Sequence, residues 1–264
     1  MLAPDPHDEP QFGAEAGEVD DEIRRLRREA RASRELLSYV CHELRSPLHL
    51  ARMGMSLVVD DHELSPRLRD DLAQADANLV RCAKLIAELL DGARIESGTI
   101  AVEPQSVDTE RLVREIVGDV VRGLEGAPVR LATHLAPDLP RAFVDPERFR
   151  QVLTNLIDNA LKFTQPETVV TISARRSQRR LGWLEFAVMD QGRGIDPLTS
   201  DQLFQPFYQA RTPQCRKGLG LGLYICRELI ERQGGEIWAE NGDTGGARFN
   251  FTVPRCALPA TMAL

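Results

Sequence analysis

Two long stretches of the chain repeat apolar residues at alternating intervals of four and three residues. The first stretch runs from Val19 to Leu44 and the second from Leu68 to Ala93. This spacing places the apolar side chains in one stripe along a helix, and such a stripe is buried only when other helices cover it. A polar turn from Asp60 to Pro66 joins the two expected helices into a hairpin. One hairpin is too small for a core of its own, so we predict a homodimer through residues 20 to 97 that forms a four-helix bundle.

A histidine, His42, lies near the end of the first stripe, shortly before Pro47. A proline inside a helix removes a backbone hydrogen bond and bends or interrupts the helix. With Leu37 and Val40 at the core positions of the heptad, His42 falls on the side farthest from the partner helix, so we expect its imidazole to face solvent. The stripe gains an extra step of four from Leu44 to Leu48, a stutter that locally unwinds a supercoil. We interpret the stutter as a place where movement of the incoming helix changes access to His42.

The segment His42 to Leu48 reads His-Glu-Leu-Arg-Ser-Pro-Leu and resembles the H box of the sensor histidine kinases. In that family the histidine is the phosphoacceptor, so the resemblance implies that His42 receives a phosphoryl group. It also implies that Glu43 orients the imidazole and accepts its proton during the transfer. Ser46 stands where many relatives carry threonine or asparagine, at a position tied to dephosphorylation of the response regulator; with serine there, phosphatase activity stays an open question.

The composition excludes several classes of function. A net charge of −7 argues against a nucleic-acid-binding protein, because such proteins usually present a basic face. No run approaches the roughly 18 apolar residues of a membrane span, and the N-terminus lacks the pattern of a secretory signal. The five cysteines are widely spaced and odd in number, which fits a reducing cytoplasm better than disulfides or a zinc site. A redox role for Cys41 or Cys215 stays open, with packing as the default explanation.

Beyond Thr99 the apolar pattern changes to short strands that alternate with helices. The expected helices are Asp108 to Leu124, a helix that starts at Asp145 and continues through Phe149 to Thr164, and Leu221 to Arg232. The expected strands are Ile100 to Glu103, Val129 to Thr133, Ala142 to Val144, Val169 to Ala174, Trp183 to Met189, Glu236 to Glu240 and Arg248 to Val253. Together they predict a mixed α+β layer with the helices on one face of the sheet.

The helix expected after Asp145 carries two asparagines four residues apart. Asn155 and Asn159 therefore share one face, and Lys162 follows one turn later. An amide oxygen can bind Mg²⁺ without adding negative charge beside a triphosphate, and a lysine supplies a point charge for a phosphate oxygen. Apolar residues surround these positions and argue against a freely solvated face, so we interpret the three side chains as part of a nucleotide site.

Further motifs follow this helix. The segment Asp190-Gln191-Gly192-Arg193-Gly194-Ile195 comes directly after an expected strand; a carboxylate there can accept from an exocyclic amine, and the glycines let a base approach the backbone. Phe204 and Phe207 supply aromatic anchors. The segment Gly218-Leu219-Gly220-Leu221-Gly222 opens the last helix, where backbone N–H groups can hold phosphates. The basic loop from Gln209 to Lys217 is predicted to be a lid over the nucleotide.

In this order the motifs resemble the N, G1, F and G2 boxes of the histidine kinase ATP-binding domain, which has the Bergerat (GHKL-type) α/β-sandwich fold. The resemblance implies that Asp190 binds the adenine amine, that Asn159 binds Mg²⁺, and that Asn155 and Lys162 lie near the phosphates. It also implies that the other residues of the boxes line the nucleotide site: Gly192, Gly194, Ile195, Phe204, Phe207, Lys217, Gly218, Gly220, Leu221 and Gly222.

Relatives of this fold that hydrolyse ATP, among them heat-shock chaperones, type II topoisomerases and mismatch-repair ATPases, carry an acid four residues before the Mg-binding asparagine. Here that position is Asn155, which cannot take a proton from water. We therefore expect a protein histidine kinase that uses ATP and Mg²⁺, phosphorylates its own His42 and passes the group to an aspartate of a separate response regulator. An ATP-binding regulator or scaffold of the same fold without kinase turnover is the alternative. A serine kinase or anti-sigma binding module would lack the histidine hairpin, and a phosphotransfer scaffold would lack the nucleotide motifs.

The sequence thus predicts an α+β multidomain protein, in which a helical hairpin that forms a dimeric four-helix bundle precedes an α/β-sandwich ATP-binding domain. The expected order is a disordered arm over residues 1–18, a coiled-coil signalling helix over 19–37, a dimerisation and histidine phosphotransfer domain over 38–98, an ATP-binding domain over 99–254 and a loose tail over 255–264. The arm is too short to bind a signal alone. We expect a cytoplasmic protein whose input comes from a separate sensor or from a further part of a longer protein.

Overall fold

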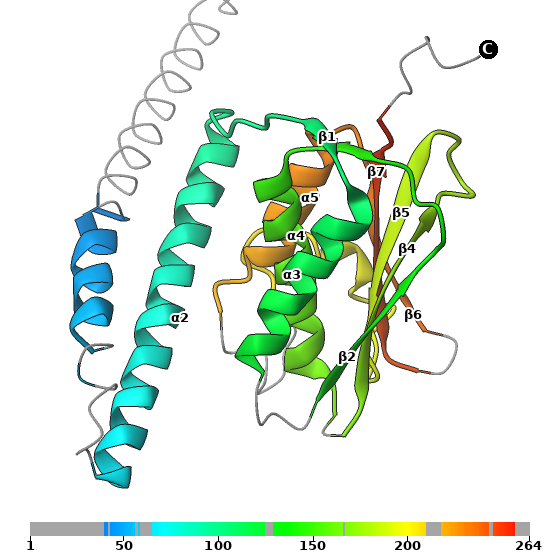
Figure 1. The fold of residues 1–264 in the computed structure, drawn as a ribbon. Coiled ribbons are helices and arrows are strands. Elements are labelled where there is room, and N and C mark those ends of the chain that lie inside the picture. Colours follow the sequence, from blue (N-terminus) through cyan, green and yellow to red (C-terminus); the bar gives the residue numbers. More distant parts are fainter. Residues whose placement is uncertain are drawn as a thin grey trace, which may run out of the picture. The chain divides into compact units, whose positions relative to one another are not determined.

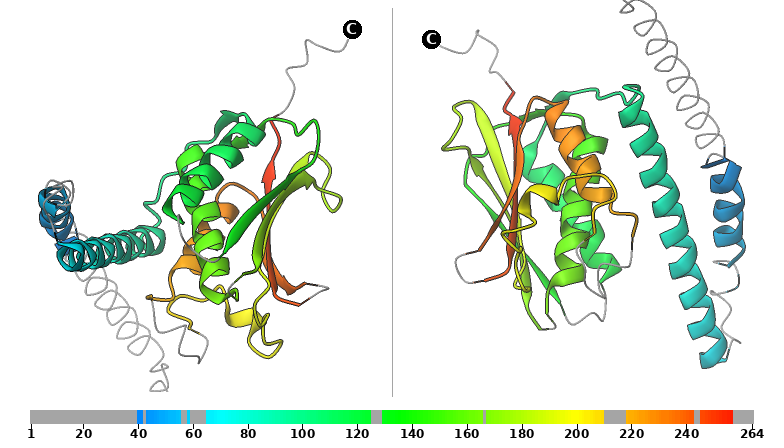
Figure 2. Two further views of the ribbon diagram at one scale, coloured as in Figure 1. Left: turned by 60° about the horizontal axis from the view of Figure 1, so that its bottom comes forward. Right: turned by 180° about the vertical axis from the view of Figure 1, so that it is seen from behind.

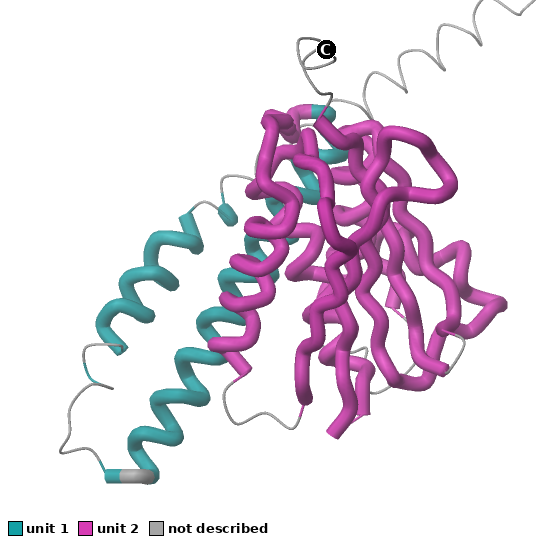
Figure 3. Tube along the Cα trace, turned by 45° about the vertical axis from the view of Figure 1, so that its right-hand side comes forward, with its two compact units in different colours: residues 1–98 teal, residues 99–264 magenta. Residues whose placement is uncertain are grey.

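The computed structural model of the protein describes residues 40–41, 43–55, 58, 65–124, 129–165, 167–209, 218–242 and 245–256. The chain divides into two compact units, Met1–Gly98 and Thr99–Leu264 (Figure 3). The expected arm, the expected coiled-coil helix, His42 and nearly all of the expected lid lie outside the described residues. None of the described helices is both long enough and apolar enough to cross a bilayer.

The first unit contains two described helical stretches. Residues 43–55 are helical without a break, so Pro47 bends the helix at most and does not interrupt it. The second helix, α2 (Pro66–Glu96), is capped by Ser65, whose side chain accepts a hydrogen bond from the Leu68 N–H at 3.3 Å. A side-chain cap of this kind satisfies one of the unpaired N–H groups of the first turn. The second helix expected from the heptad spacing is confirmed.

The two helical stretches of the first unit are joined by an apolar cluster and an ion pair. Cys41 is 2% exposed and packs with Ile86 and Leu90 of α2. Nearer the turn, Arg52 and Asp76 form an ion pair with 3.0 Å between Nε and Oδ1. The pair is largely exposed, and exposed pairs contribute only about 0–1 kcal/mol. The apolar cluster beside position 42 therefore contributes more to holding the hairpin together.

The second unit is a five-stranded sheet whose one face is covered by three helices (Figures 1 and 2). The strand order is β2-β4-β5-β7-β6, with β2 parallel to β4 and all other neighbours antiparallel. The strands are β2 (Arg130–Leu135), β4 (Val169–Arg176), β5 (Trp183–Met189), β6 (Ile237–Asn241) and β7 (Ala247–Pro254). The helices are α3 (Thr109–Gly123), α4 (Pro146–Phe163) and α5 (Gly222–Glu231). A short ladder of β1 (Gln105–Val107) with β3 (Ala142–Val144) and a 3-10 turn, η1 (Ser200–Gln202), complete the unit. The predicted α+β layer with helices on one face is confirmed.

Three phenylalanines fix α4 over the middle of the sheet. Phe149 of α4 packs edge-on against Phe186 of β5 at 5.0 Å and against Phe251 of β7 at 5.7 Å between ring centroids. Phe186 and Phe251 stack on each other at 5.0 Å. Each aromatic pair contributes about 0.5–1.5 kcal/mol beyond the burial of its area. The helix that carries the candidate nucleotide residues is thus anchored on the central strand β5 and its neighbour β7.

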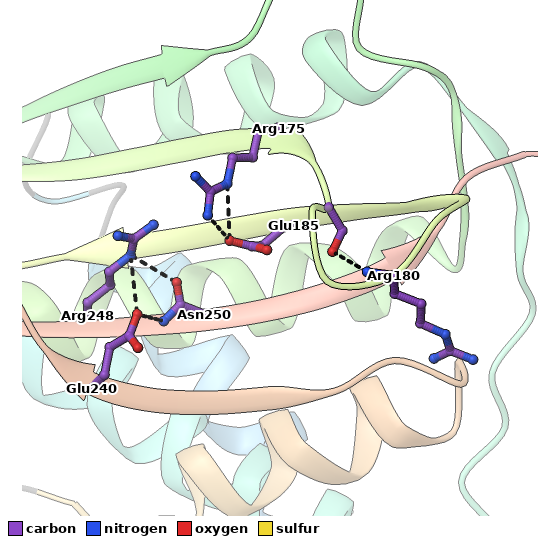
Figure 4. Close-up of polar contacts among 7 residues, drawn as sticks. Arg175, Arg180, Glu185, Glu240, Arg248 and Asn250 are labelled. Carbon is purple, nitrogen blue, oxygen red and sulfur yellow. Dashed lines mark hydrogen bonds and ion pairs between the residues drawn. The ribbon is translucent and has the colours of Figure 1, made fainter.

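The opposite face of the sheet carries polar side chains that pair with one another (Figure 4). Arg175 donates to Glu185, with 2.5 Å between Nη2 and Oε1. Asn250 donates to Glu240 at 2.9 Å and accepts from Arg248 at 2.9 Å. Glu185 and Asn250 are 4% and 1% exposed, and buried polar groups of this kind destabilise a fold unless they are hydrogen-bonded. These hydrogen bonds therefore offset the cost of burying Glu185 and Asn250 on this face of the sheet.

The prediction of a strand from Ile100 to Glu103 is wrong. All four residues are described and none is in a strand; β1 begins only at Gln105. The Glu103 N–H donates instead to Oδ2 of Asp145, the residue that caps α4, at 3.0 Å. The Glu103 N–H is thus bonded to a side-chain carboxylate and not to a carbonyl of a neighbouring strand. Apolar spacing cannot reveal a partner of this kind, because Asp145 is distant in the sequence.

The prediction of a loose tail from residue 255 is also wrong for its first two residues, Arg255 and Cys256. The Arg255 N–H donates to the Gly182 carbonyl at 3.0 Å, and the Cys256 N–H donates to the Arg141 carbonyl at 2.7 Å. These bonds hold two residues beyond β7 against the rest of the second unit. Residues 257–264 lie outside the described part of the chain.

Candidate functional site

Helix α4 presents two amide side chains beside its buried face. The residues that α4 packs into the core are Phe149, Val152, Leu153, Leu156, Ile157 and Ala160. Asn155 and Asn159 are only partly buried, and neither amide hydrogen-bonds to another residue in the described part of the chain. Both amides therefore remain available to a ligand, and their nucleotide-binding role stays a prediction.

Asp190 directly follows β5 and is 3% exposed. Its Oδ1 atom accepts hydrogen bonds from the N–H groups of Gly192 at 2.8 Å and Ala247 at 3.1 Å. The Asp190 N–H in turn donates to the Ala247 carbonyl at 2.9 Å. Among the described residues none donates to the second oxygen, Oδ2. The carboxylate is thus held in one orientation with one oxygen left for a ligand.

Two glycines allow the loop after β5 to sit where it does. A Cβ atom at Gly192 would collide with the carbonyl oxygen of Phe163, the last residue of α4. A Cβ atom at Gly246, where φ is +77°, would collide with the carbonyl oxygen of Asp190. Backbone oxygens cannot swing aside as side chains can, so only glycine fits at either position. The loop therefore contacts the end of α4 on one side and the turn between β6 and β7 on the other.

The glycine-rich motif brings the start of α5 next to α4. Gly222 is the first residue of α5, and a Cβ atom there would lie 4.0 Å from Nδ2 of Asn155. Leu221, just before the helix, is 2% exposed and anchors the motif in the core. Unpaired N–H groups at a helix start favour anions. Asn155 and the first turn of α5 are thus neighbours, as a shared phosphate site requires.

The two aromatic anchors differ in their surroundings. Phe204 is 8% exposed and packs edge-on against Phe249 of β7 at 6.5 Å between centroids. Phe207 is 61% exposed and has a left-handed backbone with φ of +62°. A Cβ atom at Gly220 would lie 2.6 Å from the carbonyl oxygen of Tyr208, so the glycine-rich motif lies directly against this segment. Only Phe204 is a core anchor; Phe207 shapes the backbone beside the motif.

Two cations gather on the ring of Phe163 at the end of α4. Lys162 Nζ lies 5.1 Å and Arg193 Cζ lies 5.5 Å from the ring centroid. Such contacts contribute about 0.5–1 kcal/mol each at exposed sites. They hold the expected phosphate-binding lysine close to the loop that carries Asp190.

On the first unit, Glu43 and Ser46 are both exposed, whereas His42 is outside the described residues. Burial raises the pKa of the Cys41 thiol above its ordinary value, and the Arg45 guanidinium offsets this rise only in part. A thiol with a raised pKa holds less thiolate at neutral pH and reacts more slowly with oxidants. The packing explanation for Cys41 is therefore favoured over a redox role; Cys215 lies outside the described residues.

The structure gathers most of the expected nucleotide residues within the second unit. Gly192, Gly194 and Ile195 lie in the loop after Asp190. In the glycine-rich motif Gly220 lies against Tyr208 and Gly222 lies near Asn155, with Gly218 and Leu221 next to them in the sequence. Lys217 lies outside the described residues.

Sequence reasoning missed three contributors to the nucleotide-binding region. Gly246 stands in a Gly-Gly pair, which is a signal of a special backbone conformation and could have been used. Phe163 and Asn241 gave no such signal, because their partners lie far away in the sequence.

Replacing Gly246 with alanine is expected to destabilise the second unit far more than the same change at Gly245. Both glycines have positive φ, +77° and +92°, which strains any other residue by roughly 1–2 kcal/mol. A Cβ atom at Gly245 meets no described atom within 4 Å, whereas at Gly246 it collides with the Asp190 backbone. Thermal unfolding should therefore give Gly246→Ala a melting temperature lower than that of Gly245→Ala by about 5 °C or more. Equal melting temperatures would contradict the close approach.

Comparison with known proteins gives the same two-part division of the chain. Residues 32–98 match the family model "His Kinase A (phospho-acceptor) domain", and residues 144–257 match the model "Histidine kinase-, DNA gyrase B-, and HSP90-like ATPase". The chain is 31% identical over 257 residues to the adaptive-response sensory kinase SasA of Trichormus variabilis, across 91% of this chain and 64% of that protein. It is 34% identical over 248 residues to the sensor protein TorS of Escherichia coli, across 91% of this chain and 26% of that protein.

Solved structures show the same likeness. Full-length ShkA in complex with AMPPNP is 28% identical and superposes with a TM-score of 0.67, over 86% of this chain and 47% of that one. The chain therefore spans less than two thirds of each of these relatives. With a phosphoacceptor domain followed by an ATP-binding domain, and with sensory kinases as its relatives, this chain belongs to the sensor histidine kinases.

Proposed function

We propose that the chain is the catalytic core of a sensor histidine kinase, which binds ATP, transfers the γ-phosphoryl group to His42 and then donates it to an aspartate of a response regulator. The observation that carries the proposal is the Asp190 carboxylate. Two backbone N–H groups hold its Oδ1 atom, and no described residue uses Oδ2. This arrangement lies in an ATPase-type domain that follows a phosphoacceptor domain in the same chain.

Recognition of the base follows from the orientation of Asp190. A buried carboxylate oxygen accepts hydrogen bonds and cannot donate, so Oδ2 suits the exocyclic amine of adenine. The 6-oxo group of guanine would instead face a second acceptor across a buried contact, which is destabilising. The site is therefore expected to prefer ATP to GTP.

The residues near the phosphates fit a magnesium–nucleotide complex. The described residues contain no group of three or more His, Cys, Asp or Glu side chains that could hold a metal by themselves. Mg²⁺ in nucleotide sites binds mainly to phosphates and water and takes only one or two protein oxygens, so the Asn159 amide is a suitable donor. When bound, Mg²⁺ would neutralise charge on the phosphates. Lys162 and the N–H groups at the start of α5 would hold the phosphate oxygens beside Asn155.

The transfer itself requires a nucleophile and a proton acceptor. Nε2 of His42 attacks the γ-phosphorus, the bond from that phosphorus to the bridging oxygen breaks, and ADP leaves. Glu43 takes the Nδ1 proton of the imidazole, so the product is a neutral phosphohistidine ring. Asn155 cannot deprotonate a water molecule, so hydrolysis lacks a general base at this position of α4.

Some apolar side chains of the hairpin remain exposed in the single chain. Val40, Leu44 and Val58 are 42%, 46% and 45% exposed, and on α2 Leu68 is 45% exposed and Cys82 is exposed. All five residues belong to the heptad stripes, and monomeric proteins rarely leave a long apolar row uncovered. We propose that a second copy of the hairpin covers this exposed stripe in a four-helix bundle.

Replacing Leu44 with glutamate is expected to separate the dimer into monomers. The carboxylate would be buried between helices without a partner, at a cost of roughly 3–5 kcal/mol. Leu50→Glu is the matched control, because Leu50 is 64% exposed on the same helix and lies outside the stripe. Sedimentation at micromolar concentration should give a dimer for the wild type and Leu50→Glu and a monomer for Leu44→Glu. A wild-type monomer, or a dimer that persists in Leu44→Glu, would count against the proposal.

Incubation of the full chain with Mg²⁺ and ATP labelled on its γ-phosphate tests the proposed function. A kinase of this type should acquire a protein-bound label that survives alkali and is lost in acid, the behaviour of a phosphorus–nitrogen bond. Release of phosphate without a label would indicate an ATPase. Binding of ATP with neither outcome would indicate a regulator or scaffold of the same fold. We include a cytoplasmic location in the proposal, since none of the described cysteines is in a disulfide.

A further inference from the structure

Asn241, the last residue of β6, pairs with the backbone of Ile195 in the loop that follows Asp190. The Ile195 N–H donates to Oδ1 of Asn241 at 2.6 Å, and Nδ2 of Asn241 donates to the Ile195 carbonyl at 3.0 Å. The side chain thus satisfies both backbone groups of one residue, as a neighbouring strand would. Among side chains of this length only a carboxamide offers a donor and an acceptor side by side.

The turn between β6 and β7 follows Asn241, and its described residues also hold the start of the loop, at Asp190. Ala247, where β7 begins, donates to the Asp190 carboxylate at 3.1 Å and accepts from the Asp190 N–H at 2.9 Å. Between these ends, Gly194 has φ of +78°, and a Cβ atom there would lie 2.6 Å from Oδ1 of Asn241. The loop from Asp190 to Ile195 is therefore attached at both ends to the turn between β6 and β7.

We propose that Asn241 is a positioning residue for the nucleotide, which holds the loop in the conformation that presents Oδ2 of Asp190 to the base. The inference rests on the proposed function and adds a residue outside the four nucleotide motifs. A loop with two glycines has many accessible conformations, and the Asn241–Ile195 pair removes most of them before the ligand arrives. Without the pair, the loop would have to become ordered when ATP binds, and the entropy lost in that step would weaken the affinity for ATP. The effect should therefore appear in the affinity for ATP and hardly at all in the transfer rate at saturation.

The neighbouring residue offers a matched control. Glu240 accepts a hydrogen bond from Asn250 at 2.9 Å on the opposite face of the sheet (Figure 4). Glu240→Ala removes a hydrogen bond from the same strand and leaves the loop after Asp190 untouched. It therefore reports the effect of a general loss of stability in the β6–β7 hairpin.

The test compares Asn241→Asp and Asn241→Ala with Glu240→Ala and the wild type in the full chain. Aspartate keeps the shape and the acceptor of asparagine but places a second oxygen against the Ile195 carbonyl. We expect the dissociation constant for Mg–ATP, measured by calorimetry, to rise about tenfold in both Asn241 variants. We expect the labelling rate at saturating ATP to change by less than about twofold. Glu240→Ala should bind ATP as the wild type does, and a loss of affinity common to all three variants would overturn the proposal.

Hydrogen exchange of the Ile195 amide gives a readout that does not depend on activity. Without nucleotide, this N–H should exchange faster in Asn241→Ala than in the wild type or in Glu240→Ala. Unchanged exchange, or a dissociation constant within twofold of wild type in both Asn241 variants, would overturn the role of Asn241 alone. A wild-type chain that does not bind ATP would contradict the proposed function, and this inference with it.

Discussion

A chain that carries His42→Gln is expected to bind ATP with wild-type affinity and to form no phosphoprotein at all. Glutamine is polar and similar in size, but the lone pair of its amide nitrogen is delocalised and cannot attack phosphorus. The residues expected to bind ATP belong to the other compact unit, Thr99–Leu264, so their local structure is expected to be unaffected. Calorimetry with an ATP analogue and labelling with ATP should therefore give opposite results for this variant.

The control for this experiment is a second histidine of the expected hairpin, His49. His49 follows His42 by seven residues, beyond the stutter at Leu44 to Leu48, and it is exposed. His49→Gln should keep the full label. A label that persists in His42→Gln, or disappears equally in both variants, would show that the acceptor is a different residue.

Asp190→Asn is expected to weaken ATP binding by about 100-fold or more and to shift the preference of the site toward GTP. The Gly192 and Ala247 N–H groups require an oxygen at the Oδ1 position, so the new amide must place its NH₂ group where Oδ2 was. A donor would then face the adenine amine, which is also a donor, in a buried contact. The 6-oxo group of guanine is an acceptor and would be matched instead.

Calorimetric titration of the Asp190→Asn variant with the Mg²⁺ complexes of ATP and GTP measures both changes. The variant should melt within a few degrees of wild type, because its two backbone hydrogen bonds are retained. Wild-type affinity for ATP in a folded variant would show that this carboxylate does not contact the base. Equal losses for both nucleotides would show that Asp190 acts on the shape of the loop and not on base recognition.

The elements of the fold that could be predicted from the sequence are those whose packing is set by local pattern. The strands Ala142–Val144 and Trp183–Met189 lie where apolar runs between breakers put them. Helix α4 starts after Asp145 because Asp and Pro at a helix start favour that boundary. The strand expected over residues 100–103 failed for the opposite reason, since its backbone is held by a carboxylate 42 residues away from Glu103.

In the candidate site, too, features set by local pattern could be predicted and features set by distant contacts could not. The motifs that contain Asp190 and the two asparagines of α4 could be found, because each is compact in sequence and its residue types suit nucleotide chemistry. Asn241 could not be found, because its partner Ile195 lies 46 residues away and an asparagine at a strand end is an ordinary turn residue. Contacts of this kind depend on where the sheet places the turn between β6 and β7 relative to the loop after β5, which no local pattern specifies.

The most direct test is to locate the transferred phosphoryl group in the wild-type chain. After incubation with Mg–ATP, the protein would be digested and sequenced by mass spectrometry without exposure to acid. We predict one phosphoryl group, attached to His42 and present only when ATP and Mg²⁺ are both supplied. A phosphoryl group on Ser46, four residues further along the chain, or ATP turnover that leaves every residue unmodified, would contradict the mechanism.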